Sequence, residues 1–232
     1  MHSHQLVLPV SLPDTETFAS FYTGYNELLI NYLKAFLNKT GFHSLYFWAN
    51  ASSGRTHLLH AACHDMSLSH KLISYIPLEQ YLLLTPDILV GLENYDLVCL
   101  DNIDHIAGNK QWEEAIFDLF NRLLENSQAK LLITGNHSPK QIPFSLPDLV
   151  SRLEWGQVYQ LKELSDGDKL NALQLRAKLR GFELSTDVGL FLLKRVDRDM
   201  RSLFNLLDKL DKATITEQRK LTIPFIKAIV NL

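Results

Sequence analysis

The feature that most constrains the fold is a short polar loop between an apolar run and a helix-like run. Residues 44–48 are apolar, the loop reads Ala49-Asn50-Ala51-Ser52-Ser53-Gly54-Arg55-Thr56, and the helical pattern covers 57–66. A strand, a loop and a helix start in this order are the context of phosphate-binding loops, in which backbone N–H groups at the helix N-terminus hold the anion. The alternative is an ordinary turn that caps a helix.

The loop departs from the full phosphate-binding motif at two positions. Ala49 stands where the motif has Gly, and Arg55 stands where it has Lys. The backbone of 53–55 can still cradle phosphates, and Thr56 still offers a hydroxyl to Mg²⁺. Because Arg is a broader, forked donor than Lys, we expect a phosphate site with altered chemistry.

A carboxylate follows a second buried run. Residues 97–100 are Leu-Val-Cys-Leu, and Asp101 comes next. Four apolar residues in a row are typical of a parallel strand buried on both faces. Ligands of open α/β sheets bind at the carboxyl ends of the strands, so we expect Asp101 to face the phosphate loop and organise a Mg²⁺ shell. The alternative is a carboxylate that caps the following turn.

Strands and helices alternate regularly through the first two thirds of the chain, which predicts a doubly wound parallel sheet. The predicted strands after the first are 71–77, 96–101, 129–136 and 157–161, with a short helical patch at 86–92 and a helix at 111–126. From Ser165 the pattern is wholly helical, with predicted helices at 168–180, 186–195, 199–213 and 224–230 and N-caps at Ser165 and Ser185. We expect an arm at 1–14, an α/β domain at 15–162 and a helical domain at 163–232.

Composition excludes several classes of protein. At 232 residues, with 46% hydrophobic and 21% charged residues, the chain has the make-up of a soluble globular protein of one or two domains. It holds no apolar run of the ~20 residues that a membrane span needs, so we expect a cytoplasmic protein without a membrane partner. The net charge of −3 argues against a chain that coats nucleic acid. Cys63 and Cys99 are expected to be reduced core residues.

Together, the loop, the strand-terminal acid and the trailing helices resemble the AAA+ ATPases. Among them the chain is most similar to the DnaA-like proteins of the Hda family, the regulatory inactivators of the replication initiator DnaA. The segments that carry the resemblance are 54–62, 100–103, 149–156 and 180–184. The resemblance implies an AAA+ P-loop parallel-sheet nucleotide-binding domain followed by a small all-helical lid, with ADP or another adenine nucleotide, and Mg²⁺, as cofactors.

The same resemblance assigns roles to individual residues. It implies that Arg152 is an arginine finger that faces a neighbouring subunit, that Asn136 is the first sensor near the terminal phosphate and that Arg201 is the lid's second sensor. It places Thr56 and Asp101 at the metal. The nucleotide-binding residues that it implies are Ser53, Gly54, Arg55, Thr56, His57, Asp101, Asn136 and Arg201.

One further departure affects the expected chemistry. AAA+ hydrolases generally carry a second acid after the strand-terminal one, whereas this chain has Asn102, which cannot serve as a base at neutral pH. Asp104 lies on the same side only if the strand continues. We therefore expect a nucleotide binder with weak or no intrinsic ATPase activity, whose Arg152 acts in trans on ATP held by DnaA. The product would be DnaA–ADP, which prevents re-initiation.

The amino-terminal segment contains a candidate partner motif. Gln5-Leu6-Val7-Leu8-Pro9-Val10 is similar to the Q-L-x-L-P-L segments of the Hda family that bind the sliding clamp, the β subunit of DNA polymerase III; it departs at Val10, where Leu is usual. Gln5, Leu6, Leu8 and Pro9 would contact the clamp. With no helix-turn-helix module expected, DNA would be reached through the clamp. The alternative is a strand that pairs with the body.

Three other interpretations stay open. A self-contained P-loop ATPase would need the intact loop and the second acid, and a helicase-loader type of AAA+ adaptor would bind a helicase in place of a clamp. A metal site is a third, because His57, His60 and His64 lie on neighbouring turns, although the zincin glutamate after the first His of the i,i+4 pair is absent. The sequence leaves the oligomeric state open, including a homo-oligomer.

Overall fold

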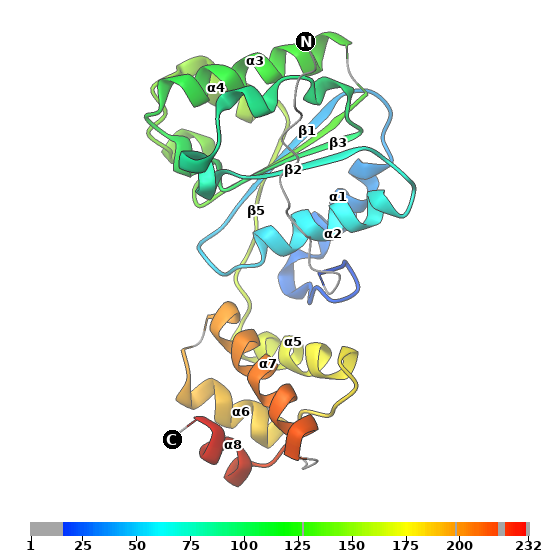
Figure 1. Cartoon of the computed structure of the whole chain (residues 1–232), viewed down its shortest axis with the longest axis vertical. Coiled ribbons are helices and arrows are strands. Elements are labelled where there is room, and N and C mark those ends of the chain that lie inside the picture. The colour runs from blue at the N-terminus through cyan, green and yellow to red at the C-terminus, as the bar shows by residue number, and fades with distance from the viewer. Residues whose placement is uncertain (1–15, 127, 198, 218–220, 231–232) are drawn as a thin grey trace. The chain divides into compact units, whose positions relative to one another are not determined.

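Five parallel strands form the sheet in the computed structural model, which describes residues 16–126, 128–197, 199–217 and 221–230. In the order β2-β3-β4-β1-β5, neighbouring strands are hydrogen-bonded (Figure 1). The strands are β1 His43–Trp48, β2 Ile73–Pro77, β3 Leu97–Asp101, β4 Lys130–Gly135 and β5 Gln157–Gln160. Strands β3 and β4 are buried at every position, as expected for central strands covered on both faces.

Helices cover both faces of the sheet. Helices α1 and α2 lie on one face, and α3 and α4 lie on the other (Figure 1). Their bounds are α1 Glu27–Leu37, α2 Arg55–Ser67, α3 Lys110–Asn126 and α4 Pro147–Trp155. Shorter 3-10 turns complete the connections: η1 Gly24–Asn26, η2 Leu78–Leu83, η3 Pro86–Leu89, η4 Leu92–Asn94, η5 Ile103–Ile106 and η6 Pro139–Gln141.

The register brings the carboxyl ends of the strands to one edge. Trp48 at the end of β1 pairs with Gly135 of β4 and with Gln160 of β5, and Pro77 of β2 pairs with Asp101 of β3. Loops that follow these ends therefore meet at the same edge of the sheet, where open α/β folds bind their ligands.

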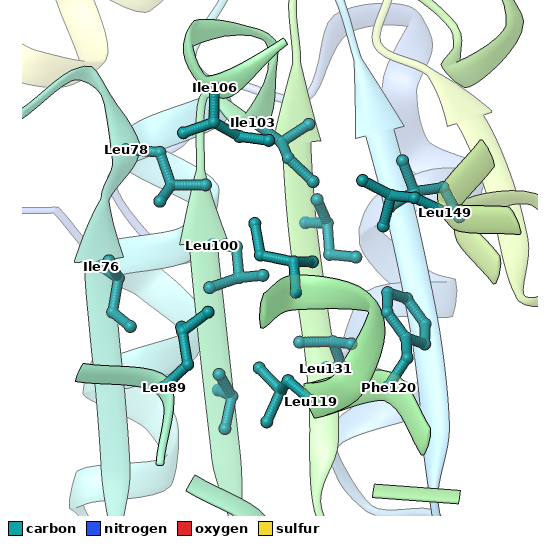
Figure 2. Packing of buried hydrophobic residues seen from close by; sticks show 14 of the residues in the cluster. Ile76, Leu78, Leu89, Leu100, Ile103, Ile106, Leu119, Phe120, Leu131 and Leu149 are labelled. Atoms are coloured by element: carbon teal, nitrogen blue, oxygen red, sulfur yellow. The ribbon is translucent and has the colours of Figure 1, made fainter. Parts of the chain in front are cut away.

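The main core lies between the sheet and α3. Leu119 and Phe120 of α3 point at the strands, where Leu100 and Leu131 meet them (Figure 2). All four side chains are fully buried. At about 25 cal/mol per Å² of apolar area removed from water, burial of such side chains stabilises the packing of α3 on the sheet.

The chain forms two compact units. The first contains residues 16–18, 26–51 and 55–161; the second contains 19–25, 52–54 and the described residues from 162 onward. The second unit is a helical bundle whose core includes Leu173, Leu192 and Leu207. Its helices are α5 Asp166–Leu179, α6 Thr186–Arg195, α7 Met200–Glu217 and α8 Ile223–Val230.

The structure confirms the predicted α/β sheet followed by a helical bundle. Both predicted N-caps are present, because the Ser165 side chain accepts a hydrogen bond from the Asp168 N–H and Ser185 accepts one from Val188. Cys63 and Cys99 are both buried thiols, with their sulfurs 3.6 Å apart. In the part of the chain that the structure describes, no helix is both long and apolar enough to cross a bilayer.

Candidate functional site

The loop between β1 and α2 makes a tight left-handed turn. Ser52 has φ 60° and Gly54 has φ 93°, so two of its residues adopt backbone conformations that side chains disfavour. A Cβ at Gly54 would also lie 2.8 Å from the Phe21 ring, which makes glycine necessary there for a second reason. Helix α2 begins directly afterwards at Arg55. The backbone N–H groups of the first turn of α2 therefore lie at the end of this loop, as in anion-binding loops.

Asp101, the last residue of β3, is the centre of a hydrogen-bond cluster. Its side chain is 2% exposed. Oδ2 accepts hydrogen bonds from Thr56 Oγ1 at 2.7 Å and from the Tyr75 hydroxyl at 2.8 Å, while Oδ1 accepts one from the Thr134 hydroxyl. The three donors come from α2, β2 and β4, so Asp101 ties the phosphate-loop helix to two strands.

The donor set around Asp101 fits a magnesium ion that arrives with phosphate. Because the hydroxyl hydrogen of Thr56 is committed to Asp101, the lone pairs of Thr56 Oγ1 remain as an oxygen ligand. Among the described residues no group of three or more His, Cys, Asp or Glu side chains is arranged to hold a metal alone. Mg²⁺ commonly binds through one or two protein oxygens plus substrate phosphates, which is what these residues offer.

Sequence reasoning missed Tyr75 and Thr134. Burial and the neighbouring Asp101 raise the pKa of Tyr75 far above its usual value of 10, so its phenol keeps its hydrogen and acts as a donor. Thr134 is fully buried, and its Oγ1 also accepts the backbone N–H of Asn102 at 2.9 Å. The sequence feature that could have pointed to them is their place near the end of a predicted strand: Tyr75 lies two residues before Pro77, and Thr134 two residues before Asn136.

The strand does not continue to Asp104, so the condition for placing it on the same side as Asp101 is not met. Strand β3 ends at Asp101, and Asn102 adopts a left-handed conformation with φ 58° and ψ 55° that turns the chain into η5. Asp104 instead reaches Asn136, whose backbone N–H donates to Oδ1 at 2.9 Å and whose amide Nδ2 donates to Oδ2. The carboxylate is thus engaged in holding a neighbouring loop.

Arg55, the residue before Thr56, contacts Asn136. Its Nη2 donates to Asn136 Oδ1 at 2.6 Å, and the side chain is 7% exposed. The structure thereby pairs Arg55 with Asn136 and Thr56 with Asp101, so the four predicted residues form two contacts at neighbouring strand ends. Hydroxyl, carboxylate and guanidinium groups in one place can bind the oxygens of a phosphate and its metal ion.

Two histidines of α2, His57 and His60, contact the chain segment that precedes α1. A ring nitrogen of His57, Nε2, lies 3.0 Å from the carbonyl oxygen of Thr17, and His60 Nδ1 lies 2.6 Å from Glu16 Oε2. The contact of His57 with Thr17 explains its position, and its predicted role at the nucleotide stays a prediction. The alternative of a zinc-type site at His57, His60 and His64 receives no support among the described residues.

Arg152 lies in α4 and contacts α3. Its Nη2 donates to Asn121 Oδ1 at 2.9 Å, and its guanidinium carbon lies 5.7 Å from the centre of the Phe117 ring. The side chain is half-buried. Helix α4, which carries Arg152, covers the face of the sheet opposite α2 (Figure 1). Arg152 is therefore not part of the Asp101 cluster, and its role in trans stays a prediction.

The remaining predicted residues lie elsewhere. Arg201 is the second residue of α7 in the helical unit, and its side chain is exposed. Beside it, hydrogen bonds from Ser202 hold the pKa of Asp199 below its usual value. Ser53 directly precedes Gly54 in the loop, and its predicted role at the nucleotide stays a prediction. Gln5, Leu6, Leu8 and Pro9 lie outside the described residues.

Comparison with known families identifies the class of protein. Residues 12–160 match the model of the bacterial DnaA ATPase domain, and the chain therefore belongs to that family. Residues 166–230 match the model of the Hda lid domain. The chain thus combines a DnaA-type AAA+ domain with a lid of the Hda type.

Solved structures confirm the AAA+ fold. Domain III of the replication initiation protein DnaA from Thermotoga maritima is 19% identical, with a TM-score of 0.78 over 95% of this chain and 98% of that one. AMPPCP-bound DnaA from Aquifex aeolicus is 21% identical, with a TM-score of 0.69 over 85% and 65%. The Holliday junction branch migration motor RuvB of Thermotoga maritima follows at 15%, with a TM-score of 0.66 over 88% and 68%. At these identities the likeness concerns the fold.

Proposed function

We propose that this chain is an ADP-binding regulator that inactivates the replication initiator DnaA. The observation that carries the proposal is the succession of a DnaA ATPase-domain match and an Hda lid match along one chain. The resemblance of the loop, acid and finger segments to the Hda family points the same way.

The site supports the nucleotide part of the proposal. The buried guanidinium of Arg55 and the hydroxyl of Thr56 lie at the start of α2, next to the carboxylate of Asp101. A related fold, the Aquifex aeolicus DnaA, was solved with AMPPCP bound. We infer that ADP binds here with its phosphates on the loop, and that Mg²⁺, when bound, neutralises phosphate charge through Thr56 and Asp101.

The surroundings of Asn102 and Asp104 support weak intrinsic hydrolysis. Asn102 occupies the position after Asp101 and directs its backbone N–H to Thr134. Both oxygens of Asp104 accept hydrogen bonds from Asn136. A general base needs an acceptor within hydrogen-bond reach of the attacking water. The Asn102 amide does not take up a proton at neutral pH, and the Asp104 carboxylate is engaged by Asn136.

Arg152 supplies the proposed action on DnaA. Asn121 and Phe117 hold its guanidinium on α4 while the side chain remains half-exposed. An arginine inserted in trans neutralises the charge that develops on a transferring phosphoryl group, and such a finger is worth ~10³–10⁵ in rate. Presented to DnaA–ATP, Arg152 would convert it to DnaA–ADP.

The clamp part of the proposal rests on the sequence alone. Gln5, Leu6, Leu8 and Pro9 would dock on the sliding clamp, which would bring the regulator to DNA without direct DNA recognition by this chain. Coupling to a clamp loaded on DNA would confine the inactivation of DnaA to the time after replication has begun.

The experiment that tests the proposal is an omission series. Hydrolysis of ATP by purified DnaA is measured with this protein, ADP, the sliding clamp and DNA, and each component is left out in turn. We expect stimulation that requires all of them. Absence of stimulation, with ADP still bound, would contradict the proposal in favour of a helicase-loader type of adaptor, which a helicase pull-down would then detect. Rapid hydrolysis by this protein alone would favour a self-contained ATPase.

A further inference from the structure

Asp104 accepts two hydrogen bonds from Asn136. The backbone N–H of Asn136 donates to Oδ1 at 2.9 Å, and its side-chain amide Nδ2 donates to Oδ2. One carboxylate therefore fixes both the path of the chain after β4 and the rotamer of the Asn136 side chain. With Nδ2 committed to Asp104, the amide oxygen Oδ1 must point the other way.

Arg55 binds that amide oxygen. Its Nη2 donates to Asn136 Oδ1 at 2.6 Å. The orientation of the amide is unambiguous, because the carboxylate of Asp104 only accepts and the guanidinium of Arg55 only donates. A flipped amide would face an acceptor with its oxygen and a donor with its NH₂. The three side chains therefore form a directional series, Asp104 to Asn136 to Arg55.

Tyr46 also holds the backbone on either side of Asn136. The Tyr46 hydroxyl donates to the carbonyl oxygen of His137 at 2.6 Å. It also lies 2.1 Å from where a Cβ of Gly135 would be, so only glycine fits before Asn136. If the Asn136 amide turned, the loop after β4 would have to move, and the contacts of Tyr46 oppose that movement.

This series explains how an arginine can replace the usual lysine. Lysine carries a point charge on a flexible stem, whereas the planar guanidinium of Arg is effective only when its plane is set correctly. We propose that Asp104 is a positioning residue that acts through Asn136 to orient Arg55 toward the phosphates of a bound nucleoside diphosphate. The inference rests on the proposed nucleotide site. Asn136 transmits the orientation while keeping Asp104 from pairing directly with Arg55, so the guanidinium charge stays available to the phosphate.

The test uses two variants, Asp104→Asn and Asn136→Asp. Asp104→Asn leaves one acceptor oxygen for two donors, and Asn136→Asp places two carboxylates face to face.

The readout is the ratio of ADP affinity to AMP affinity, measured by calorimetry with Mg²⁺, together with the unfolding midpoint without nucleotide. We expect each variant to bind ADP about tenfold more weakly with AMP binding changed less than about twofold. Asp96→Asn, which makes the same substitution just before the first residue of β3, serves as the control and should leave the ratio unchanged.

The outcomes separate the inference from the proposed function. If wild-type protein binds ADP and Asp104→Asn binds it equally well, or if ADP and AMP affinities fall together, the positioning role is wrong while the nucleotide site stands. If wild-type protein does not bind ADP, the proposed function fails and the inference fails with it.

Discussion

Asp101 is the residue on which the candidate site depends most. It accepts hydrogen bonds from the hydroxyls of Thr56, Tyr75 and Thr134. Asp101→Asn would set an NH₂ group against at least one of these donors. We expect the nucleotide-free protein to lose about 1–3 kcal/mol of unfolding free energy and nucleotide binding to lose its dependence on Mg²⁺. Urea denaturation and ADP titrations with and without Mg²⁺ would show both effects; unchanged values in both would refute the role.

A second carboxylate gives a prediction about pH. The backbone N–H of Leu72, at 2.9 Å, and the ammonium of Lys71, at 3.1 Å, hold the pKa of Asp96 below its usual value of 3.8. A depressed pKa in the folded state means that the carboxylate stabilises the fold above pH ~4 and that this contribution is lost as the pH falls through the folded pKa.

Asp96→Asn should therefore destabilise the protein at pH 7 and much less at pH 3. We expect a loss of at most about 1 kcal/mol at pH 7, because the Asp96 side chain is 35% exposed and solvent screens it. Urea denaturation of both proteins at the two pH values measures the difference. A destabilisation of equal size at pH 7 and pH 3 would show that the charge of Asp96 plays no part.

At the scale of elements, a fully buried acid anchors the entry to α4. Glu113 of α3 accepts the backbone N–H of Gly108 through Oε1 and that of Leu146 through Oε2, each at 2.7 Å. Leu146 directly precedes α4, the helix that carries Arg152. Glu113 thus fixes the start of α4 against α3, while Asn121 holds Arg152 further along it.

Glu113→Gln should weaken this anchor. The glutamine can accept only one of the two N–H groups and leaves the other facing its own NH₂, which costs about 1–3 kcal/mol. We expect a lower unfolding midpoint and faster hydrogen exchange in 146–155, measured by mass spectrometry. Glu114→Gln, at an exposed neighbouring position of α3, is the control and should change neither quantity. Unaltered exchange in α4 would argue against the anchoring role of Glu113.

Local patterns of sequence were enough to predict the elements and part of the site. Continuous apolar runs marked β3 and β4, helical spacing marked α3, and the loop motif marked Arg55 and Thr56. The contributions of Tyr75 and Thr134 could not be predicted, because they depend on the register between strands that are distant in the chain. The turn at Asn102, which takes Asp104 to Asn136, depends on a left-handed residue that no periodicity indicates.

At the scale of the whole molecule, the amino-terminal segment is predicted to supply the clamp contact. Leu6→Ala together with Leu8→Ala should remove two apolar anchors of the docking segment and weaken clamp binding at least tenfold, because each buried leucine contributes about 1.5–3 kcal/mol. ADP affinity should stay unchanged, since the site residues Arg55, Thr56 and Asp101 are untouched. Surface-immobilised clamp would measure the first quantity and calorimetry the second. Undiminished clamp binding would show that Leu6 and Leu8 do not contact the clamp.

The central claim is that Arg152 acts on ATP held by DnaA. The contacts of Arg152 with Asn121 and Phe117 are partly exposed, so Arg152→Ala should cost about 1 kcal/mol of stability and leave the fold and ADP binding intact. Lys140→Ala is a matched control, because Lys140 is an exposed cation that pairs with Glu154 of α4 at 3.1 Å.

The most direct test is single-turnover hydrolysis of ATP preloaded on DnaA, with clamp-bound DNA, ADP and either wild-type protein, Arg152→Ala or Lys140→Ala. We predict that Arg152→Ala reduces the rate to that of DnaA alone, and that Lys140→Ala stimulates hydrolysis as wild type does. Full stimulation by folded, ADP-bound Arg152→Ala protein would contradict the claim.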